Sequence, residues 1–172
     1  MLKLFVKMIA TGVITEEPPD EATSAALGAE LKRGLNRYFR GSIAIRHVDA
    51  GSCNACELEI HALSNPFYNV ERYGVHFVAS PRHADVLLVT GPVSRHMEAA
   101  LRRTWEAMPH PKWVIASGDC ACDGGEFGAS YASCGAVDNI IPVDLRIPGC
   151  PPAPTDLLSG LLQLMQTPYV EE

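Results

Sequence analysis

The sequence predicts an α/β protein, built on an open parallel β-sheet with helices on both faces. From residue 43 onward, short apolar runs typical of strands alternate with segments of helical periodicity. The run centred on Val86–Thr90 is unbroken, as expected for a strand that is buried on both faces. A chain of 172 residues with 47% hydrophobic and 20% charged residues is long enough for one domain with a full core.

Residues 1–42 are predicted to form an N-terminal extension that contains the polar linker "TEEPPDE". After the linker, Glu21–Phe39 carries apolar residues at a spacing of four, which predicts an amphipathic helix. Its other side is basic, with Lys32, Arg33 and Arg37. Such a helix can lie on a membrane surface, on a partner subunit, or on the core of its own domain. The pattern alone does not distinguish these alternatives.

Residues 43–172 are predicted to form the main domain, in which strands and helices alternate. Short apolar runs predict strands at Ile43–Val48, Val75–Ala79, Val86–Thr90, Trp113–Ser117 and Asn139–Val143. Helical patterns predict helices at Glu57–Leu63, at 94–107 and in a leucine-rich segment that Pro154 opens. In open parallel sheets, ligands bind beyond the carboxyl ends of the strands. The loops that follow these strands are therefore the first place to look for a site.

Composition narrows the classes of function. The formal net charge of −6, with no large basic block, argues against nucleic acid as a partner. No run approaches the roughly 20 apolar residues of a spanning helix. Lys7 interrupts the apolar start and no cleavage site follows it, so we expect no signal peptide and place the chain in the cytoplasm. Thiols stay reduced there, so six cysteines indicate metal or redox chemistry rather than disulfides.

Cysteines stand in turns marked by glycine or proline, and each of these turns follows a predicted strand. The local sequences are "AGSCNACELEI" with Cys53 and Cys56, "ASGDCACDGGEF" with Cys120, and "RIPGCPPAP" with Cys150. All three turns belong to the carboxyl edge of the predicted sheet. Four thiolates brought to one edge are the ligands that a 4Fe–4S cluster takes. The sequence therefore predicts a cluster that relays electrons.

Several alternatives remain open on spacing alone. Cys122 stands two positions from Cys120, so either could be the third ligand. Cys134 lacks a comparable frame and, like Cys122, fits a small buried apolar side chain. A structural zinc site also uses four thiolates, but it commonly pairs two C-x2-C motifs, and here the second is missing. A redox-active dithiol explains the C-x-x-C motif but not the other framed cysteines.

Three segments carry a resemblance to a known family: "SPRHADVLLVTGPVS", "KWVIASGDCACDGGEF" and "DNIIPVDLRIPGCPPAPTDLLSGLLQL". They resemble the cluster-bearing small subunit that respiratory complex I (the 20 kDa, or B-type, subunit) shares with membrane-bound nickel–iron hydrogenases. The resemblance covers roughly residues 43–165. It implies a flavodoxin-like fold and one 4Fe–4S cluster. It further implies that Cys53, Cys56, Cys120 and Cys150 are the ligands, and that Cys122 is not one.

The form of the first motif refines the resemblance. Complex I subunits carry two adjacent cysteines here, whereas "CNAC" is similar to the C-x-G-C form of energy-converting hydrogenases and formate hydrogenlyase, with Ala55 in place of the usual glycine. "GDCACDGG" also differs from the commoner "GACANSGG", at Asp119 and Cys122 among others. The resemblance further points to Glu57 and Glu59 as carboxylates near the cluster that couple proton to electron movement, although a solvated or subunit-facing position is an equally good reading of either.

The function that the resemblance implies is that of a non-catalytic electron-transfer subunit in an oxidoreductase complex. The expected complex is of the group 4 nickel–iron hydrogenase or formate hydrogenlyase type, peripheral on the cytoplasmic face of the membrane. Its partners would be a large catalytic subunit, a ferredoxin-like subunit with two 4Fe–4S clusters, and membrane-arm subunits. Two alternatives are a complex I-like quinone oxidoreductase and, from another class, a stand-alone zinc or redox-dithiol module of flavodoxin type.

Overall fold

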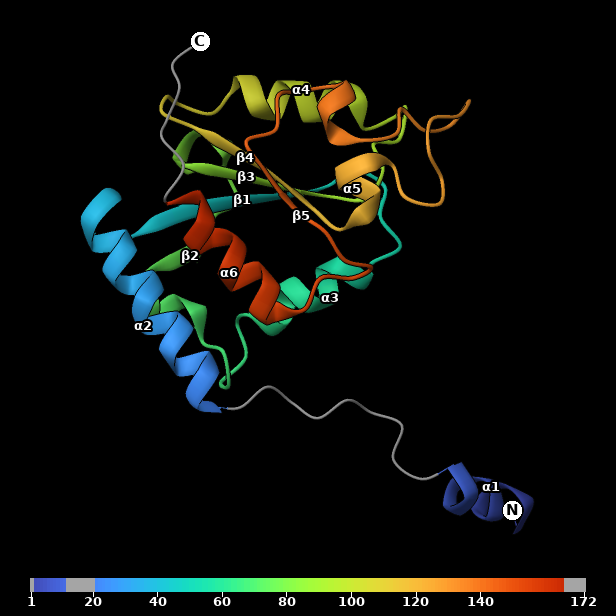
Figure 1. The fold of residues 1–172 in the computed structure, drawn as a ribbon. Coiled ribbons are helices and arrows are strands. Elements are labelled where there is room, and N and C mark those ends of the chain that lie inside the picture. The colour runs from blue at the N-terminus through green and yellow to red at the C-terminus, as the bar shows by residue number, and fades with distance from the viewer. Residues whose placement is uncertain (1, 12–20, 166–172) are drawn as a thin grey trace.

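Five parallel strands form one sheet in the order β2-β1-β3-β4-β5 (Figure 1). The computed structural model describes residues 2–11 and 21–165. The strands are β1 (Ile43–Asp49), β2 (Val75–Phe77), β3 (Val86–Thr90), β4 (Trp113–Ser117) and β5 (Leu145–Ile147). This order is that of the flavodoxin-like fold, whose ligand site lies at the switch point between the first and third strands. The predicted fold class is confirmed.

Helices cover both faces of the sheet. On one face lie α2 (Glu21–Tyr38), α3 (Ala55–Ala62) and α6 (Pro154–Leu164), and α4 (Glu98–Glu106) lies on the other (Figure 1). The core is accordingly in two parts, because successive side chains of a strand point to opposite faces. Ile43, Ile45 and Ile115 pack in the first part, and Val89 and Val114 pack in the second. All five residues of β3 are buried, as its apolar sequence predicts.

Helix α2 packs on the core of its own domain. It contacts α6, and Leu31 and Leu35 are both 0% exposed within the first part of the core. The basic side chains on its other side are exposed. The apolar stripe is therefore occupied within the chain, which decides the question that the sequence left open for this helix. The division of the chain at residue 42 stays a prediction.

The fifth strand does not lie where the sequence indicated. Residues Val137–Asn139 form a 3-10 helix, and Ile140 and Ile141 pack in the second part of the core, so the prediction of a strand at Asn139–Val143 is wrong. Pro142 has no N–H to donate to a ladder. The pairing starts only after the Asp144 carboxylate has accepted a hydrogen bond from the Val114 N–H at 2.6 Å. The strand β5 then pairs with β4 from Leu145.

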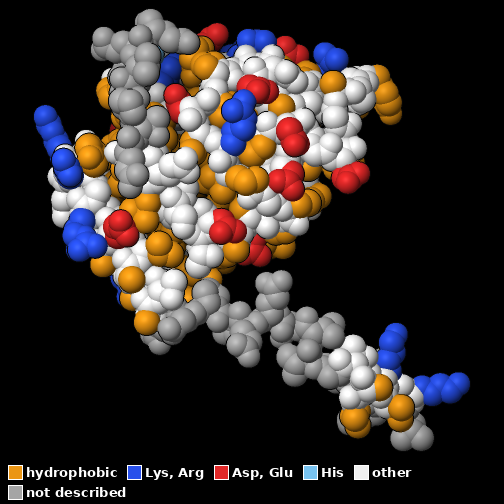
Figure 2. Space-filling model, viewed as in Figure 1, with side chains coloured by type: hydrophobic (Ala, Val, Ile, Leu, Met, Phe, Trp, Pro, Cys, Tyr) orange, Lys and Arg blue, Asp and Glu red, His pale blue; other side chains and the backbone are white. Residues whose placement is uncertain are grey.

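Among the described residues, two α-helices were not predicted from the sequence. Helix α1 (Leu2–Thr11) precedes the linker, of which residues 15–20 lie outside the described ones. Helix α5 (Asp119–Asp123) is a single turn directly after β4, where the glycine-rich sequence indicated only a loop. Within the described ranges, no helix has the length and apolar content needed to cross a membrane. On the face shown in Figure 2, acidic and basic side chains are scattered among hydrophobic ones.

Candidate metal centre

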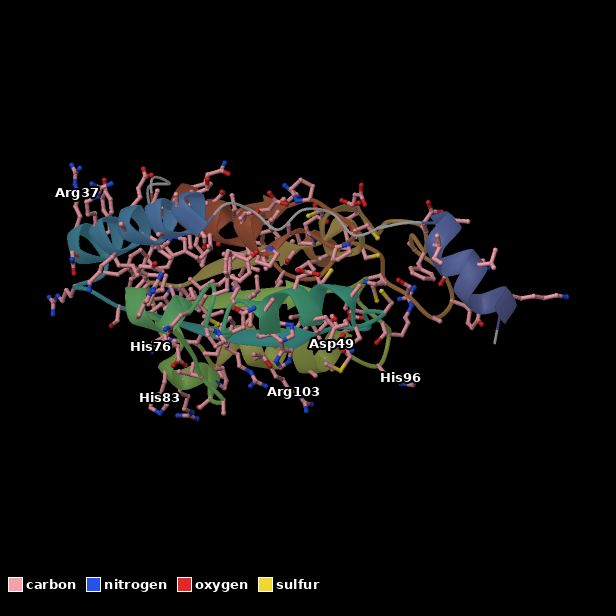
Figure 3. All side chains as sticks on the ribbon, turned by 90° about the horizontal axis from the view of Figure 1, so that it is seen from below. Arg37, Asp49, His76, His83, His96 and Arg103 are labelled. Atoms are coloured by element: carbon pink, nitrogen blue, oxygen red, sulfur yellow. The ribbon has the colours of Figure 1, made fainter. Side chains whose placement is uncertain are left out.

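The four cysteines predicted as ligands stand on three segments at the carboxyl edge of the sheet. Cys53 lies in the loop between β1 and α3, and Cys56 lies in the first turn of α3. Cys120 lies in α5 after β4, and Cys150 follows β5. Sulfur atoms gather at this end of the sheet, beside Asp49 at the end of β1 (Figure 3). Cys53 and Cys150 are exposed, and Cys56 and Cys120 are half-buried. The site is therefore an open one at the surface.

The first cysteine loop is shaped by its own polar groups. The Asp49 carboxylate accepts hydrogen bonds from the backbone N–H groups of Gly51 and Ser52, both at 2.8 Å. The Ser52 hydroxyl accepts another from the Asn54 N–H at 3.0 Å. Asn54 is left-handed, with φ of 74°, and α3 begins directly after it. The turn thus places Cys53 before the helix and Cys56 in its first turn.

Two glycines make room for the thiols. A Cβ on Gly118 would lie 2.6 Å from the Cys56 sulfur, and one on Gly125 would lie 2.9 Å from the Cys120 sulfur. Both glycines have positive φ, of 90° and 53°, which other residues rarely adopt. The glycines that the sequence places around Cys120 are therefore needed for both backbone conformation and space. They form a cradle that any side chain would fill.

The loops after β4 and β5 are tied to each other. The Asp119 carboxylate accepts a hydrogen bond from the Gly149 N–H at 2.7 Å, and the Asp119 N–H donates one to the Gly149 carbonyl at 2.9 Å. The peptide bond between Cys150 and Pro151 is cis. The two hydrogen bonds between Asp119 and Gly149 hold the segment before Cys150 against the segment before Cys120. Two of the three cysteine-bearing segments are thereby positioned as one unit.

The thiols interact electrostatically. Burial, then the charges of Glu57 and of the three other predicted ligands, raises the pKa of Cys56 to about 12. Burial also raises the pKa of Cys120, and the charges of Cys150 and Cys53 add to that effect. The neighbouring thiols therefore disfavour ionisation of Cys56 and Cys120, as expected where thiols share one site. A bound metal reverses this, because its positive charge stabilises thiolates.

The two remaining cysteines face the protein interior. Cys122 packs beside the second part of the core, and its thiol donates a weak hydrogen bond to the Ala116 carbonyl at 3.5 Å. Burial raises its pKa to about 11. Cys134 is buried, and its thiol donates to the Glu98 carboxylate at 3.5 Å. Cys134 is thus a small buried side chain, as the sequence suggested, whereas Cys122 is half-buried.

The geometry also bears on the zinc alternative. Thiolates on a structural zinc ion converge on one point, at about 2.3 Å from the metal. Across residues 2–11 and 21–165, no group of three or more Cys, His, Asp or Glu side chains is placed to hold a metal ion. An iron–sulfur cluster takes the same four thiolates but interposes its own iron and sulfide atoms between them.

The two carboxylates named from the resemblance differ in their surroundings. Glu57 is 6% exposed and accepts hydrogen bonds from the hydroxyls of Ser52 and Thr90, whereas Glu59 is half-buried and stands outside this network. His47 Nε2 lies 3.0 Å from the Thr90 hydroxyl and 3.8 Å from Glu57. Sequence reasoning missed both Thr90 and His47. Thr90 is a polar residue at the end of an otherwise apolar strand, and this pattern could have indicated a polar contact at the carboxyl edge.

Comparison with known proteins places the chain in a family. The model of the family described as NADH ubiquinone oxidoreductase, 20 kDa subunit, matches residues 53–164. Formate hydrogenlyase subunit 7 of Escherichia coli is 45% identical over 77% of this chain and 52% of its own length. The chain thus spans about half the length of that relative. The probable membrane-bound hydrogenase subunit mbhJ of Pyrococcus furiosus is 47% identical over 77% of this chain and 79% of its own length.

Solved structures show the same fold. A chain of the membrane-bound sulfane sulfur reductase, an archaeal respiratory membrane complex, superposes with a TM-score of 0.65 at 33% identity, over 80% of this chain and 75% of that one. A chain of an NAD⁺-reducing nickel–iron hydrogenase, at 19% identity and a TM-score of 0.56, covers 76% of this chain and 96% of that one, and supports the fold alone. The family match includes all four predicted ligands. The chain therefore belongs to the 20 kDa subunit family shared by complex I and nickel–iron hydrogenases.

Proposed function

We propose that this chain is the electron-transfer subunit of a membrane-bound hydrogenase-type complex and carries one 4Fe–4S cluster. Cys53, Cys56, Cys120 and Cys150 would hold the cluster, and no catalytic residue would lie in this chain. The observation that carries the proposal is the convergence of these thiols at one sheet edge, around glycines that leave space for them. When bound, the cluster supplies a one-electron carrier. The chain supplies its position and surroundings.

The relatives support the choice of complex. Two of them are named as a formate hydrogenlyase subunit and a probable membrane-bound hydrogenase subunit, both at about 45% identity. Electrons would pass through the cluster between a ferredoxin-like subunit with two 4Fe–4S clusters and the large catalytic subunit. Membrane-arm subunits would hold the complex at the cytoplasmic face of the membrane, so that this chain is peripheral. The exposed cysteines mark the edge at which the large subunit would dock.

A second candidate is the same electron-transfer role in a complex I-like quinone oxidoreductase, which the family description favours. The two candidates differ in the large subunit, because nickel is bound there. Nickel in the purified complex, together with hydrogen-dependent reduction of the cluster, supports the hydrogenase type. Quinone reduction by a nickel-free complex supports the alternative.

We also propose that Glu57, rather than Glu59, is the carboxylate that couples proton movement to the cluster. Glu57 is buried beside Cys56 and bonded to two hydroxyls, and through Thr90 it reaches His47. In the purified complex, Glu57→Gln is expected to flatten the pH dependence of the cluster's midpoint potential, whereas Glu59→Gln leaves it unchanged. An unchanged pH dependence in the Glu57 variant would rule out this role.

The deciding test of the cluster is a pair of matched variants in the anaerobically purified complex. We expect Cys53→Ser to remove one cluster signal from the electron paramagnetic resonance (EPR) spectrum and about four iron and four sulfide atoms per complex. Cys122→Ser, in a thiol that faces the core, is expected to keep both. The proposal fails if Cys53→Ser leaves the spectrum and the iron content unchanged. It also fails if zinc without acid-labile sulfide is found, which would indicate the zinc module instead.

A further inference from the structure

Within the described part of the chain, Ser117 has a buried side-chain hydroxyl without a hydrogen-bond partner. It is the last residue of β4 and is 0% exposed. Its hydroxyl oxygen has no hydrogen-bond partner among the described residues. Burying a hydroxyl without a replacement for its bonds to water is unfavourable, and nearly all buried polar groups in proteins are satisfied. We therefore expect a bound group at this place to form a hydrogen bond with the Ser117 hydroxyl.

The strand register shows where the hydroxyl points. Ser117 is paired with Thr90 of β3 on one side and with Ile147 of β5 on the other. Residues paired across neighbouring strands direct their side chains to the same face. Thr90 directs its hydroxyl to Glu57 of α3, and Ile147 packs in the part of the core below α6. The Ser117 side chain therefore points into the layer that holds α3 and the first cysteine pair.

The next residue along the chain brings the thiols close. Gly118 follows Ser117, and a Cβ on Gly118 would lie 2.6 Å from the Cys56 sulfur. Cys120 comes two residues later, in α5. Ser117 thus lies at the carboxyl end of β4, next to the residue that contacts Cys56. The hydroxyls of Ser52 and Thr90, which lie nearby, are already committed to Glu57.

We propose that the Ser117 hydroxyl donates a hydrogen bond to a sulfur of the bound cluster, either the Cys56 thiolate or an inorganic sulfide, and so raises its reduction potential. The inference rests on the proposed function, since it needs the cluster. Reduction adds one electron and increases the negative charge on the sulfurs, so a donor stabilises the reduced form more than the oxidised form. Hydrogen bonds to the sulfurs are among the features that set cluster potentials.

The test is a redox titration of the purified complex, followed by EPR. Ser117→Ala is expected to shift the cluster's potential to a more negative value, with up to about a tenfold fall in the equilibrium constant for reduction, or about 59 mV for one electron. Ser117→Thr keeps the hydroxyl and is expected to restore most of the shift. Ser24→Ala, at a buried serine on α2, is the control and is expected to leave the potential unchanged.

A second measurement covers the case in which the alanine variant does not assemble. In the reduced wild-type complex, hyperfine spectra in H₂O and D₂O should show an exchangeable proton coupled to this cluster, and Ser117→Gly should lack it. The proposal is overturned if the wild type has no such proton, if the proton persists without the hydroxyl, or if Ser117→Ala leaves the potential unchanged. A wild-type complex without the cluster signal would instead overturn the proposed function.

Discussion

At the scale of single residues, the site depends on glycines that leave space for the thiols. Gly118 and Gly125 each lie so close to a cysteine sulfur that an added Cβ would clash with it. The charges of the thiols oppose one another, so the site is poorly suited to ionised cysteines until a metal is present.

Gly118→Ala is expected to disrupt the cluster, because its Cβ would lie 2.6 Å from the Cys56 sulfur and its φ of +90° is strained for alanine. Cluster occupancy in the purified complex, measured by iron and sulfide content, should fall by roughly tenfold, since site misplacement and strain act together. Gly128→Ala is the matched control. It has positive φ, of +53°, with nothing within 4 Å of its Cβ, so it carries strain without a clash. Equal loss in both variants would contradict the role of space.

Cluster binding is expected to weaken as the pH falls. The iron ligands must be thiolates, and Cys56 and Cys120 have raised pKa values, so bound iron has to displace protons from them. Visible absorbance after incubation between about pH 8.5 and 6 should show progressive loss of the cluster. Without iron, stability depends on pH in the opposite direction. The raised pKa of Cys56 stabilises the cluster-free fold below pH 9, and that contribution is lost as the pH rises towards 12. A cluster that is equally stable at both ends of the range would contradict the first expectation.

At the scale of elements, the packing of α2 and the position of β5 show what patterns can and cannot reveal. The spacing of leucines predicted α2 correctly but left three possible partners for its apolar face. The hydrophobic run at Asn139–Val143 looked like a strand because buried 3-10 and loop residues share the composition of strands. Only the pairing of Asp144 with the backbone of β4 decided where β5 begins.

Leu31→Ala is expected to lower the free energy of unfolding by about 2–5 kcal/mol, because it opens a cavity where a fully buried leucine contacts the core. Lys32→Ala, one position along the same helix and exposed, is expected to change it by less than about 0.5 kcal/mol. Thermal denaturation of the purified protein measures both. If α2 instead reserved its apolar face for a membrane or a partner, the two variants would unfold alike.

At the scale of the whole molecule, the cysteine edge combines open thiols with exposed apolar side chains. Leu58, two residues after Cys56, is 62% exposed, and Phe127, in the turn after α5, is 66% exposed. Tyr38 is also exposed, but it ends α2, which leads into the start of β1, and it therefore lies at the amino end of the sheet. Large apolar side chains left in solvent beside an open site are typical of a surface that a partner covers.

Leu58→Asp combined with Phe127→Asp is therefore expected to reduce co-purification of the large subunit by roughly tenfold or more, since charges in the centre of an interface remain unpaired. Tyr38→Asp is the matched control and should keep the complex intact. Affinity purification through a tag on this chain, with quantification of the partner, measures the difference. Retention of the large subunit in the double variant would place the docking surface elsewhere.

The sequence by itself determined the parallel sheet, four of its five strands, the edge that holds the cysteines and, through its motifs, the family. These features follow from local rules: strand periodicity, turn residues and the convergence of strand ends. Tertiary structure alone decided which face α2 covers, where β5 pairs, and that Cys122 turns to the core while Glu57, Thr90 and His47 meet. Contacts between residues distant in the chain depend on register and packing, which local patterns do not encode.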